Sequence, residues 1–493
     1  MRIFITGVTG LVGRALALRL ARDGHEPIGW VRNEGAARAI LGDSVQLVPV
    51  GASDDTLAEA LGTSDAVINL AGAPVAQRWS ADHRRALVHS RVDLTRRLVG
   101  VMRDMPRRPS VLLSASAVGF YGDRGDERLD EGADPGDDFL SALCVDWEAA
   151  ALEAQQYGLR VAVLRIGLVL DGEGGALAAM RPAFGLGLGA VIGSGRQMMP
   201  FIHLHDLVEM FVRALADDRF SGPFNATAPT PVSNREFSRA LGRALGRPVL
   251  LRVPSFAMRL ALGEAAAIVL HGQRAVPQRA SSLGFEFRFP TVDGALRDAL
   301  DGGRSSVYIG PALDPPSGEY LRERRPRYLL EQRTSIDAPL HEVFDFFRKA
   351  ENLGVMTPPA LAFEIRTPTP IEMERGRTIT YRIRLGPAPM RWLTRIEAWE
   401  PGHRFVDAQM RGPYRCWYHE HVFEADGART HMVDRVWYAP PLGVLGRIAQ
   451  VLMVGPMLRR IFGHRRCAIA LRFGLARRHG GPPGRAQPLR AAS

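Results

Sequence analysis

Three glycines near the amino terminus constrain the fold of this chain more than any other feature. In the segment FITGVTGLVGRAL, Gly7, Gly10 and Gly13 lie between an apolar, β-branched run and an amphipathic stretch with helical spacing. Such a turn needs backbone angles that glycine adopts at little cost, and it lets the main chain approach a diphosphate closely. The N–H groups at the helix start then receive the negative charge. The spacing therefore predicts a strand, a phosphate-binding turn and a helix.

The segments that follow predict a parallel sheet with helices on both faces. Up to about residue 300, short runs that are apolar almost throughout alternate with amphipathic stretches. The strand-like runs are RIFIT, EPIGWV, VQLVPV, DAVINLA, SVLLSA and RVAVLRI. Strands that are apolar on both faces and alternate with helices are typical of an α/β, Rossmann-type, doubly wound sheet.

The end of the second strand bears on the choice of cofactor. A cofactor without a 2′-phosphate usually meets an acidic residue at this point. Here EPIGWV is followed by Arg32 and Asn33. Because a guanidinium is a planar fork that suits a phosphate, we expect NADP(H) rather than NAD(H). The alternative is that Arg32 is only a solvated surface charge.

Six segments of the first 300 residues resemble a known family. They are ITGVTGLVG, DAVINLAGAPVAQRW, VLLSASAVGFYGD, VLRIGLVL, GLGLGAVIGSGRQMMPFIHLHDLV and GPFNATAPTPVSNREF. Together they resemble the atypical extended short-chain dehydrogenase/reductases, which are NAD(P)-dependent epimerase/dehydratase-like proteins. The resemblance implies that the glycine turn binds NADP(H) and that the NLAG run lies beside the adenine ribose and pyrophosphate. The residues expected at the cofactor are therefore Gly7, Thr9, Gly10, Leu11, Val12, Gly13, Arg32, Asn69, Leu70, Ala71 and Gly72.

The catalytic pair of that family is missing from this chain. The family normally uses a Tyr-x-x-x-Lys pair on one helix face, in which the lysine lowers the pKa of the tyrosine and the tyrosine exchanges a proton with the substrate. In DDFLSALCVDWE the matching positions are Phe139 and Leu143, and the single lysine of the chain, Lys349, lies far away in the sequence. The site therefore lacks the usual proton relay.

Two other side chains are candidates for catalytic contact with a substrate. Ser116 approximately matches the family's catalytic serine, with Ser114 as the alternative, and Tyr121 follows a few residues later in SASAVGFYGD. An unassisted tyrosine stays protonated at neutral pH, so it would donate a proton during reduction more readily than accept one. The alternative is that Ser116 and Tyr121 are structural.

From Arg327 the pattern becomes that of an α+β domain. A strand, RYLLEQRTSI, and an amphipathic helix, APLHEVFDFFRKAENL, precede five long strands: TITYRIRL, RWLTRIEAWE, HRFVDAQM, YRCWYHEHVFE and HMVDRVWYA. A helix from about Leu442 to Phe473 closes the segment. These motifs resemble a START-like domain of the SRPBCC class, which includes polyketide cyclases and lipid-transfer proteins. The resemblance implies a helix-grip fold with an apolar cavity.

Composition suggests how the chain divides into domains. We expect an NADP-binding domain with its substrate lobe over residues 1–300 and a START-like ligand-binding domain over 327–476. Residues 301–326 are rich in Gly, Pro and charge, so they predict a linker. The tail 477–493 is rich in Gly, Pro and Arg and is predicted to be disordered.

The strand segment WYHEH raises the question of a metal site. Trp417, His419 and His421 share one face of a strand. The two histidines could bind a metal, act as acid and base in a cavity, or face solvent. We expect them to face solvent, and we expect no metal site in the chain.

Composition narrows the range of partners and location. The formal charge is +11, but the arginines are scattered rather than grouped with aromatic residues, so nucleic acid is not an expected partner. Three separated cysteines, Cys144, Cys416 and Cys467, and an opening MRIFITG without an export signal favour the cytoplasm. The segment LGVLGRIAQVLMVGPMLRRI is interrupted by Arg447 and Pro456, so we expect no membrane span.

These features lead to one functional interpretation and two alternatives. We expect an NADP(H)-dependent oxidoreductase or epimerase-family protein that acts on an apolar or aromatic small molecule and carries a fused hydrophobic-ligand-binding domain. The first alternative is an NADPH-binding sensor or scaffold without turnover. The second is a cyclase or dehydratase whose chemistry lies in the C-terminal domain.

Overall fold

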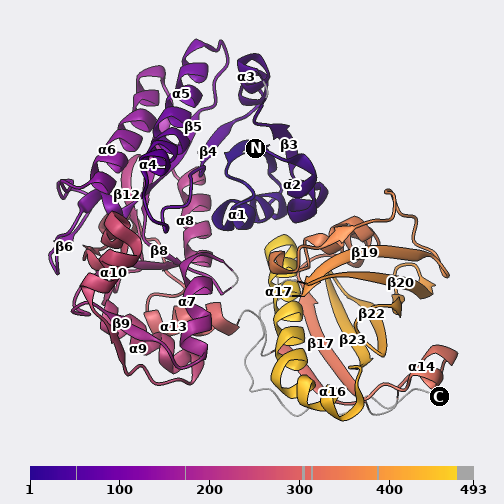
Figure 1. Ribbon diagram of the computed structural model, residues 1–493. Helices are drawn as coiled ribbons and strands as arrows, with labels where there is room; N and C mark the ends of the chain where they lie inside the picture. Colours follow the sequence, from indigo (N-terminus) through magenta and orange to yellow (C-terminus); the bar gives the residue numbers. More distant parts are fainter. Residues whose placement is uncertain (52, 173, 302–305, 313–314, 386–387, 475–493) are drawn as a thin grey trace.

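The structure is a computed structural model of the 493-residue chain. It describes residues 1–51, 53–172, 174–301, 306–312, 315–385 and 388–474, so the tail 477–493 that was predicted to be disordered lies outside the described residues. Two large sheets organise the chain, a parallel one from the N-terminal part and an antiparallel one from the C-terminal part (Figure 1).

The N-terminal sheet has seven strands in the order β12-β7-β5-β4-β1-β2-β3, and all neighbours are parallel. Its strands are β1 (Arg2–Thr6), β2 (Glu26–Val31), β3 (Gln46–Pro49), β4 (Ala66–Asn69), β5 (Val111–Ala117), β7 (Arg160–Ile166) and β12 (Gly222–Ala226). The first six correspond to the predicted apolar runs, which confirms the Rossmann-type sheet. The seventh, GPFNA, is short and contains glycine and proline, so its pattern alone was a weak indication of a strand.

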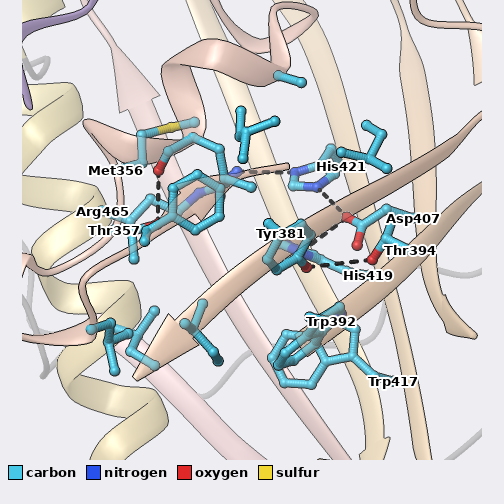
Figure 2. A pocket seen from close by; sticks show the side chains of 18 of the residues that line it. Met356, Thr357, Tyr381, Trp392, Thr394, Asp407, Trp417, His419, His421 and Arg465 are labelled. Atoms are coloured by element: carbon cyan, nitrogen blue, oxygen red, sulfur yellow. Dashed lines mark hydrogen bonds and ion pairs between the residues drawn. The ribbon is translucent and has the colours of Figure 1, made fainter. Parts of the chain in front are cut away.

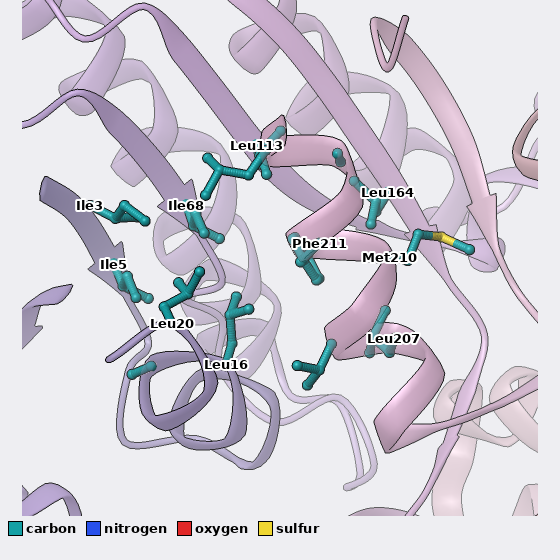
Figure 3. Packing of buried hydrophobic residues seen from close by; sticks show 14 of the residues in the cluster. Ile3, Ile5, Leu16, Leu20, Ile68, Leu113, Leu164, Leu207, Met210 and Phe211 are labelled. Carbon is teal, nitrogen blue, oxygen red and sulfur yellow. The ribbon is translucent and has the colours of Figure 1, made fainter. Parts of the chain in front are cut away.

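Helices cover both faces of this sheet, as strands that are apolar on both sides require. On one face, Ile3 and Ile5 of β1 pack with Leu16 of α1 (Leu11–Arg22) and Phe211 of α8 (Leu204–Ala216), as Figure 3 shows. On the other face, Phe4 belongs to a cluster formed with α3 (Asp54–Gly62), α5 (Leu94–Asp104) and α6 (Phe139–Leu152). Alternate residues of one strand therefore belong to two separate cores.

Between β5 and residue 301 the chain adds a smaller lobe of short strands and helices. Its larger elements are α7 (Gly175–Gly185), α9 (Asn234–Leu245) and α13 (Val292–Asp301), and each of them contributes to one apolar cluster. The short strands of this region are β6 (Arg128–Leu129), β8 (Leu168–Leu170), β9 (Ala190–Ile192), β10 (Met198–Met199), β11 (Phe201–His203), β13 (Val232–Ser233), β14 (Leu251–Val253) and β15 (Arg274–Ala275).

The C-terminal sheet has eight antiparallel strands in the order β16-β17-β23-β22-β21-β20-β19-β18. They are β16 (Val307–Pro311), β17 (Tyr328–Ile336), β18 (Glu364–Ile365), β19 (Thr378–Leu385), β20 (Ala388–Glu400), β21 (Arg404–Arg411), β22 (Cys416–Asp426) and β23 (Arg429–Ala439). After β23 the chain continues through α16 (Gly443–Ala449), the short helix η9 (Gln450–Val454) and α17 (Gly455–Phe473). Helix α17 runs beside the strands of this sheet in Figure 1, next to β17.

Apolar side chains hold α17 against the antiparallel sheet. Leu458 and Phe462 share a cluster with Trp417, and Phe473 belongs to a second cluster with Phe344 of α15 (Leu340–Phe347). The predicted helix from Leu442 to Phe473 is therefore present, although it is built from three successive segments.

The stretch 301–326, which was expected to be a linker, contains regular structure instead. Strand β16 pairs with β17, and Ile309 lies opposite Leu330. In α14 (Glu319–Arg324) the side chain of Tyr320 is buried, and its hydroxyl donates to the carbonyl oxygen of Gln409 at 2.8 Å. The run VYI is a short alternating strand, and the glycines and prolines around it concealed this pattern.

Helices α1 and α17 bring the two parts of the chain into contact. Leu18 of α1 is buried in the same apolar cluster as Ile336 and Ile469. Arg22 donates from Nη1 to the carbonyl oxygen of Ala470 at 3.0 Å. The basic end of α1 thus binds a backbone group of α17.

Among the described helices, none combines the length and the apolar character that crossing a bilayer would require.

Candidate functional site

The glycine turn between β1 and α1 is packed so closely that side chains do not fit at two of its positions. Gly7 has a φ of +66°, and a Cβ there would lie 2.7 Å from the carbonyl oxygen of Leu70. A Cβ on Gly13 would lie 2.3 Å from the carbonyl oxygen of Gly7. Glycine is therefore needed at position 7 for its backbone angle and at position 13 for the close approach of helix to turn.

The backbone of the first turn of α1 is exposed at the edge of the sheet. Gly10 is the N-cap residue, and no side chain caps the helix. Thr9 and Gly10 are exposed, and Leu11 and Val12 are partly exposed. N–H groups at a helix start that no side chain caps form a suitable site for a phosphate. The turn thus fits the diphosphate of a dinucleotide.

A buried hydroxyl holds the NLAG run against this turn. Oγ1 of Thr6 donates to Oδ1 of Asn69 at 2.7 Å. This threonine oxygen also accepts from the N–H groups of Leu70 and Ala71, both at 3.0 Å. Asn69 is fully buried and donates in turn to Oγ1 of Thr95. The side chain of Asn69 therefore fixes the run in place, and the backbone from Leu70 onward borders the glycine turn.

Arg32 lies at the carboxyl end of β2, where the second strand leaves the sheet. Its neighbour Asn33 caps α2 (Glu34–Leu41) by accepting from the N–H of Ala36 at 2.9 Å, which fixes the loop. The Arg32 side chain is exposed, and it forms no ion pair with any residue that the structure describes. An exposed guanidinium at this edge fits a 2′-phosphate.

An apolar cluster occupies the place of the missing catalytic pair. Leu143 and Trp147 of α6 are buried with Ala115 of β5, and Phe139 packs at the edge of this group. The ring of Phe139 lies 5.3 Å from that of Trp79, centre to centre. The helix that carries the proton relay in the family thus presents carbon atoms here.

Ser116 takes part in a buried ion-pair network. Its hydroxyl donates to Oε1 of Glu148 at 2.6 Å. Glu148 also binds Arg165 through two hydrogen bonds of 2.9 Å, and both side chains of the pair are at most 6% exposed. The alternative serine, Ser114, is fully buried as well and donates to the carbonyl oxygen of Ala115. Both serine hydroxyls are therefore already bonded within the protein.

Tyr121 extends the same network. Its side chain is 0% exposed, and its hydroxyl accepts from Nη1 of Arg165 at 3.0 Å and lies 2.8 Å from Oδ1 of Asn225, to which it can donate. Burial raises the pKa of the Tyr121 hydroxyl, although Arg165 opposes the shift. The sequence did not single out Glu148. The signal that could have found it is a carboxylate beside Trp147 on the sheet-facing side of an otherwise apolar helix.

The C-terminal sheet and α17 enclose a second site, a cavity of about 180 Å³. An engineered cavity of about 150 Å³ in another protein holds benzene, so this space is large enough for a small aromatic molecule. Its walls are mainly apolar, and they include Tyr381, Trp392, Tyr414, Trp417, Ile461 and Phe462.

The polar side chains of this cavity gather at one place on its wall. Asp407 of β21, His419 and His421 of β22 and Arg465 of α17 point toward one another (Figure 2). The two histidines are only 7% and 3% exposed, so the expectation that they face solvent is wrong. Strand β22 lies in the middle of the sheet and α17 covers its inner face, which the alternating sequence pattern alone does not show.

Burial and neighbouring charges shift the pKa values in this group. Burial, with a smaller contribution from the adjacent His421, lowers the pKa of His419 to about 4. Burial by itself would raise the pKa of Asp407, but its hydrogen bond with His421 and the charges of His419 and Arg465 outweigh that and leave it lowered. At neutral pH this wall therefore carries an ionised carboxylate next to a neutral imidazole.

Comparison with known proteins accounts for the N-terminal part of the chain. The model of the "NAD dependent epimerase/dehydratase family" matches residues 3–226, and a "domain of unknown function (DUF1731)" matches residues 253–299. The "Epimerase family protein SDR39U1 homolog, chloroplastic" of Arabidopsis thaliana is 40% identical over 299 residues, which are 60% of this chain and 86% of that protein. The chain belongs to this epimerase/dehydratase family. The match to DUF1731 falls on the small lobe, which the family resemblance had included in the first domain.

Other members of the epimerase family show the same coverage. Mouse "Epimerase family protein SDR39U1" is 35% identical over 305 residues, which are 61% of this chain and all of the mouse protein. The crystal structure of the human SDR39U1 protein, solved with NADPH, matches with 32% identity and a TM-score of 0.55, and covers 61% of this chain and 99% of the human one. The seven-stranded sheet is therefore the family's fold, and each of these matches leaves about two fifths of the chain uncovered.

Proposed function

We propose that this protein binds NADP(H) at the glycine turn and uses it to reduce a small apolar molecule, while its C-terminal part binds a hydrophobic ligand. The cofactor supplies a hydride when it is bound. The open start of α1, the backbone of Leu70 to Gly72 and the exposed Arg32 support this cofactor. The human relative solved with NADPH gives independent support.

The apolar cluster around Leu143 is the observation that carries the proposal for the substrate. In place of a tyrosine and a lysine, α6 offers Phe139 and Leu143 beside buried Trp147. Apolar side chains at this place offer a sugar no hydrogen-bond partners, so they favour an apolar or aromatic body.

The same cluster limits the type of reaction. Without a protein acid, hydride transfer must produce an anion that survives until water protonates it. Quinones meet this condition, since the hydroquinone anion is a phenolate, and phenolic groups have pKa values near 10. The net reaction combines a quinone, NADPH and one proton to give a hydroquinone and NADP⁺.

The C-terminal part is assigned a START-like, helix-grip architecture. The support is the antiparallel sheet, the long helix α17 across it and the apolar cavity between them. The domains then divide between the end of α13 at Asp301 and the start of β16 at Val307, so residues 301–326 are largely part of the second domain. The three cysteines, Cys144, Cys416 and Cys467, form no disulfide in the part of the chain that the structure describes, which supports a reducing compartment such as the cytoplasm.

The proposal is tested with the full-length protein. Calorimetry with NADPH and NADH measures nucleotide binding, and NADPH oxidation is followed with a panel of quinones, ketones and enones. We expect NADPH to bind more tightly than NADH, and at least one quinone to be reduced faster than in a reaction without protein. The absence of binding to either nucleotide would refute the proposal.

One observation favours a second function, that of an NADPH-binding sensor without turnover. The hydroxyls of Ser116 and Tyr121 are both engaged in buried hydrogen bonds, so neither is free for a substrate. Tight NADPH binding together with no oxidation by any member of the panel would select this function over the first.

A further inference from the structure

Three potential metal ligands converge on the wall of the C-terminal cavity. Oδ2 of Asp407 lies 3.5 Å from Nδ1 of His419 and 3.2 Å from Nε2 of His421. The ligand atoms of all three residues lie within 4.8 Å of one another. A tetrahedral ion with bonds of about 2.0–2.1 Å holds its ligand atoms about 3.3 Å apart, so these spacings match a coordination sphere.

The remaining nitrogen of each histidine faces a second carboxylate. Nε2 of His419 lies 3.1 Å from Oδ1 of Asp434, and Nδ1 of His421 lies 2.8 Å from the same oxygen. Arg465 fixes Asp434 through Nε and Nη2, at 3.1 and 3.2 Å. Metal-binding histidines almost always donate their other N–H to a group such as this carboxylate, which sets the tautomer and the ring orientation.

A neutral imidazole cannot satisfy both carboxylates, because it carries one N–H and one lone pair. If the N–H groups of His419 and His421 point to Asp434, their lone pairs point toward Asp407. Two lone pairs and a buried carboxylate then face one another, which is unfavourable unless a cation lies between them.

The charges of the buried group lead to the same conclusion. Two buried carboxyl groups, those of Asp407 and Asp434, meet the two imidazoles here together with one guanidinium, that of Arg465. Arg465 pairs with Asp434, whereas the described ion-pair contacts of Asp407 are with the imidazoles of His419 and His421. A buried charge is retained when it is paired or coordinates a metal.

We propose that Asp407, His419 and His421 bind a divalent transition-metal ion, Zn²⁺ or Fe²⁺ by the chemistry of two imidazoles and one carboxylate. Three protein ligands leave at least one position open, and all three line the cavity, so the open position faces the apolar space. The ligand of the cavity would then be an apolar molecule with an oxygen donor, such as a carbonyl or phenolate group, that reaches the ion.

This inference rests on the cavity that was assigned a hydrophobic ligand above, but it is tested with the metal alone. The metal-free, untagged protein is titrated with Zn²⁺ by calorimetry, and bound metal is counted by mass spectrometry after gel filtration. We expect one ion per chain. His421→Ala should weaken binding more than 100-fold, and Asp434→Asn should weaken it 10- to 100-fold because it loosens both imidazoles. His431→Ala, which alters an exposed histidine of β23 that is bonded to Asp426, should bind like the wild type.

A second measurement does not depend on the variants folding. Co²⁺ in place of Zn²⁺ should give the strong visible absorption of a four- or five-coordinate site in the wild-type protein. No Co²⁺ absorption and no stoichiometric Zn²⁺ would overturn the inference. In that event the competing arrangement holds, in which Nη2 of Arg465, 3.1 Å from Nδ1 of His421, donates to it and Nε2 donates to Asp407. Neither result bears on NADPH binding at the glycine turn, so the two proposals can fail separately.

Discussion

Arginine side chains serve two opposite purposes at the edge of the N-terminal sheet. Arg32 follows β2 and is exposed without an ion-pair partner among the described residues, which suits it for an external phosphate. Arg165 lies near the end of β7, is 4% exposed, and has its charge neutralised by Glu148. Each of the two residues lies close to the carboxyl end of a strand of the parallel sheet. The difference is that a buried carboxylate, Glu148 of α6, faces Arg165, whereas no carboxylate pairs with Arg32 among the described residues.

The role of Arg32 predicts a change in cofactor preference. Arg32→Ala should weaken NADPH binding about 10- to 100-fold, because a hydrogen bond to a charged group contributes about 1.5–3 kcal/mol. NADH binding should be almost unchanged, since NADH has no 2′-phosphate. Calorimetry measures both. Arg239→Ala, which removes an exposed arginine from α9, is the control, and an equal loss of affinity for both nucleotides would contradict the assigned role.

Tyr121 was predicted from the sequence as a proton donor, and its environment gives that prediction a sharp test. Tyr121→Phe leaves Oδ1 of buried Asn225 without the hydroxyl that donates to it and removes one acceptor from Nη1 of Arg165, so the protein should lose about 1–3 kcal/mol of stability while NADPH affinity stays constant. Thermal or urea denaturation measures the loss. Tyr157→Phe, at a hydrogen bond to Glu153 on the surface, should be nearly neutral.

The kinetic outcome separates the two roles of Tyr121. If a quinone is reduced, its turnover should be unaffected by Tyr121→Phe at temperatures where the variant is folded. A drop of 100-fold or more in kcat with unchanged stability would instead support the catalytic role.

At the level of helices and strands, α6 shows what the sequence can and cannot predict. The absence of the Tyr-Lys pair was evident from Phe139 and Leu143, and the structure adds that both residues belong to one apolar cluster. The partner of Ser116 was not evident. Glu148 follows Trp147 in this largely apolar helix, and only the packing of α6 on β5 and β7 shows that the carboxylate points inward to Arg165.

The Glu148–Arg165 pair links α6 to β7, and its removal predicts a large change in stability. Glu148→Gln leaves a buried guanidinium without a counter-charge and should cost about 3–5 kcal/mol in the free energy of unfolding. The double variant Glu148→Leu with Arg165→Met should recover much of this loss, because it removes both charges. Urea denaturation of Glu148→Leu, Arg165→Met and the double variant measures the coupling.

A solvent-exposed ion pair is the control for this cycle. Asp54→Asn breaks the pair between Asp54 of α3 and Arg97 of α5, both partly exposed, and should change stability by no more than about 1 kcal/mol. Equal effects of Glu148→Gln and Asp54→Asn would show that the buried network does not stabilise the packing of α6.

The strands of the second sheet were predictable from their alternation, but their inner face was not. The pattern of YRCWYHEHVFE places Trp417, His419 and His421 on one side, and the structure confirms this. The sequence pattern could not show which side of the sheet α17 covers. Nor could it show that Asp407 and Asp434 from neighbouring strands meet those histidines, because strand order and register are long-range properties.

For the whole molecule, the contact between α1 and α17 joins the sheet that carries the glycine turn to the sheet that lines the apolar cavity. Helix α1 begins at the glycine turn, and α17 forms one wall of the cavity. The side chains between them include Leu18, Arg22 and, on α17, His464. Nothing in the sequence of either part predicts this contact. Leu18 follows the pattern of an ordinary core position, and its partners are more than 300 residues away.

His464 makes this contact sensitive to acid. Burial, together with the nearby cations Arg14 and Arg460, lowers the pKa of His464 to about 3. In the unfolded chain the imidazole takes up a proton below about pH 6.5. Above pH 6.5 His464 therefore does not change the free energy of unfolding. As the pH falls from 6.5 toward the pKa of the folded protein, the free energy of unfolding decreases by up to about 1.4 kcal/mol per pH unit. His419, with a pKa of about 4, acts in the same direction.

The acid effect is measured by urea denaturation at several values between pH 7.5 and pH 4.5. We expect His464→Gln to flatten the dependence of unfolding free energy on pH in this window, because glutamine cannot bind the proton that the unfolded histidine binds. His431→Gln, at an exposed histidine, should keep the slope of the wild type. If His464→Gln and the wild type lose stability at the same rate, the histidine is not neutral in the folded protein, and the acid sensitivity of the contact between the two sheets must come from other groups.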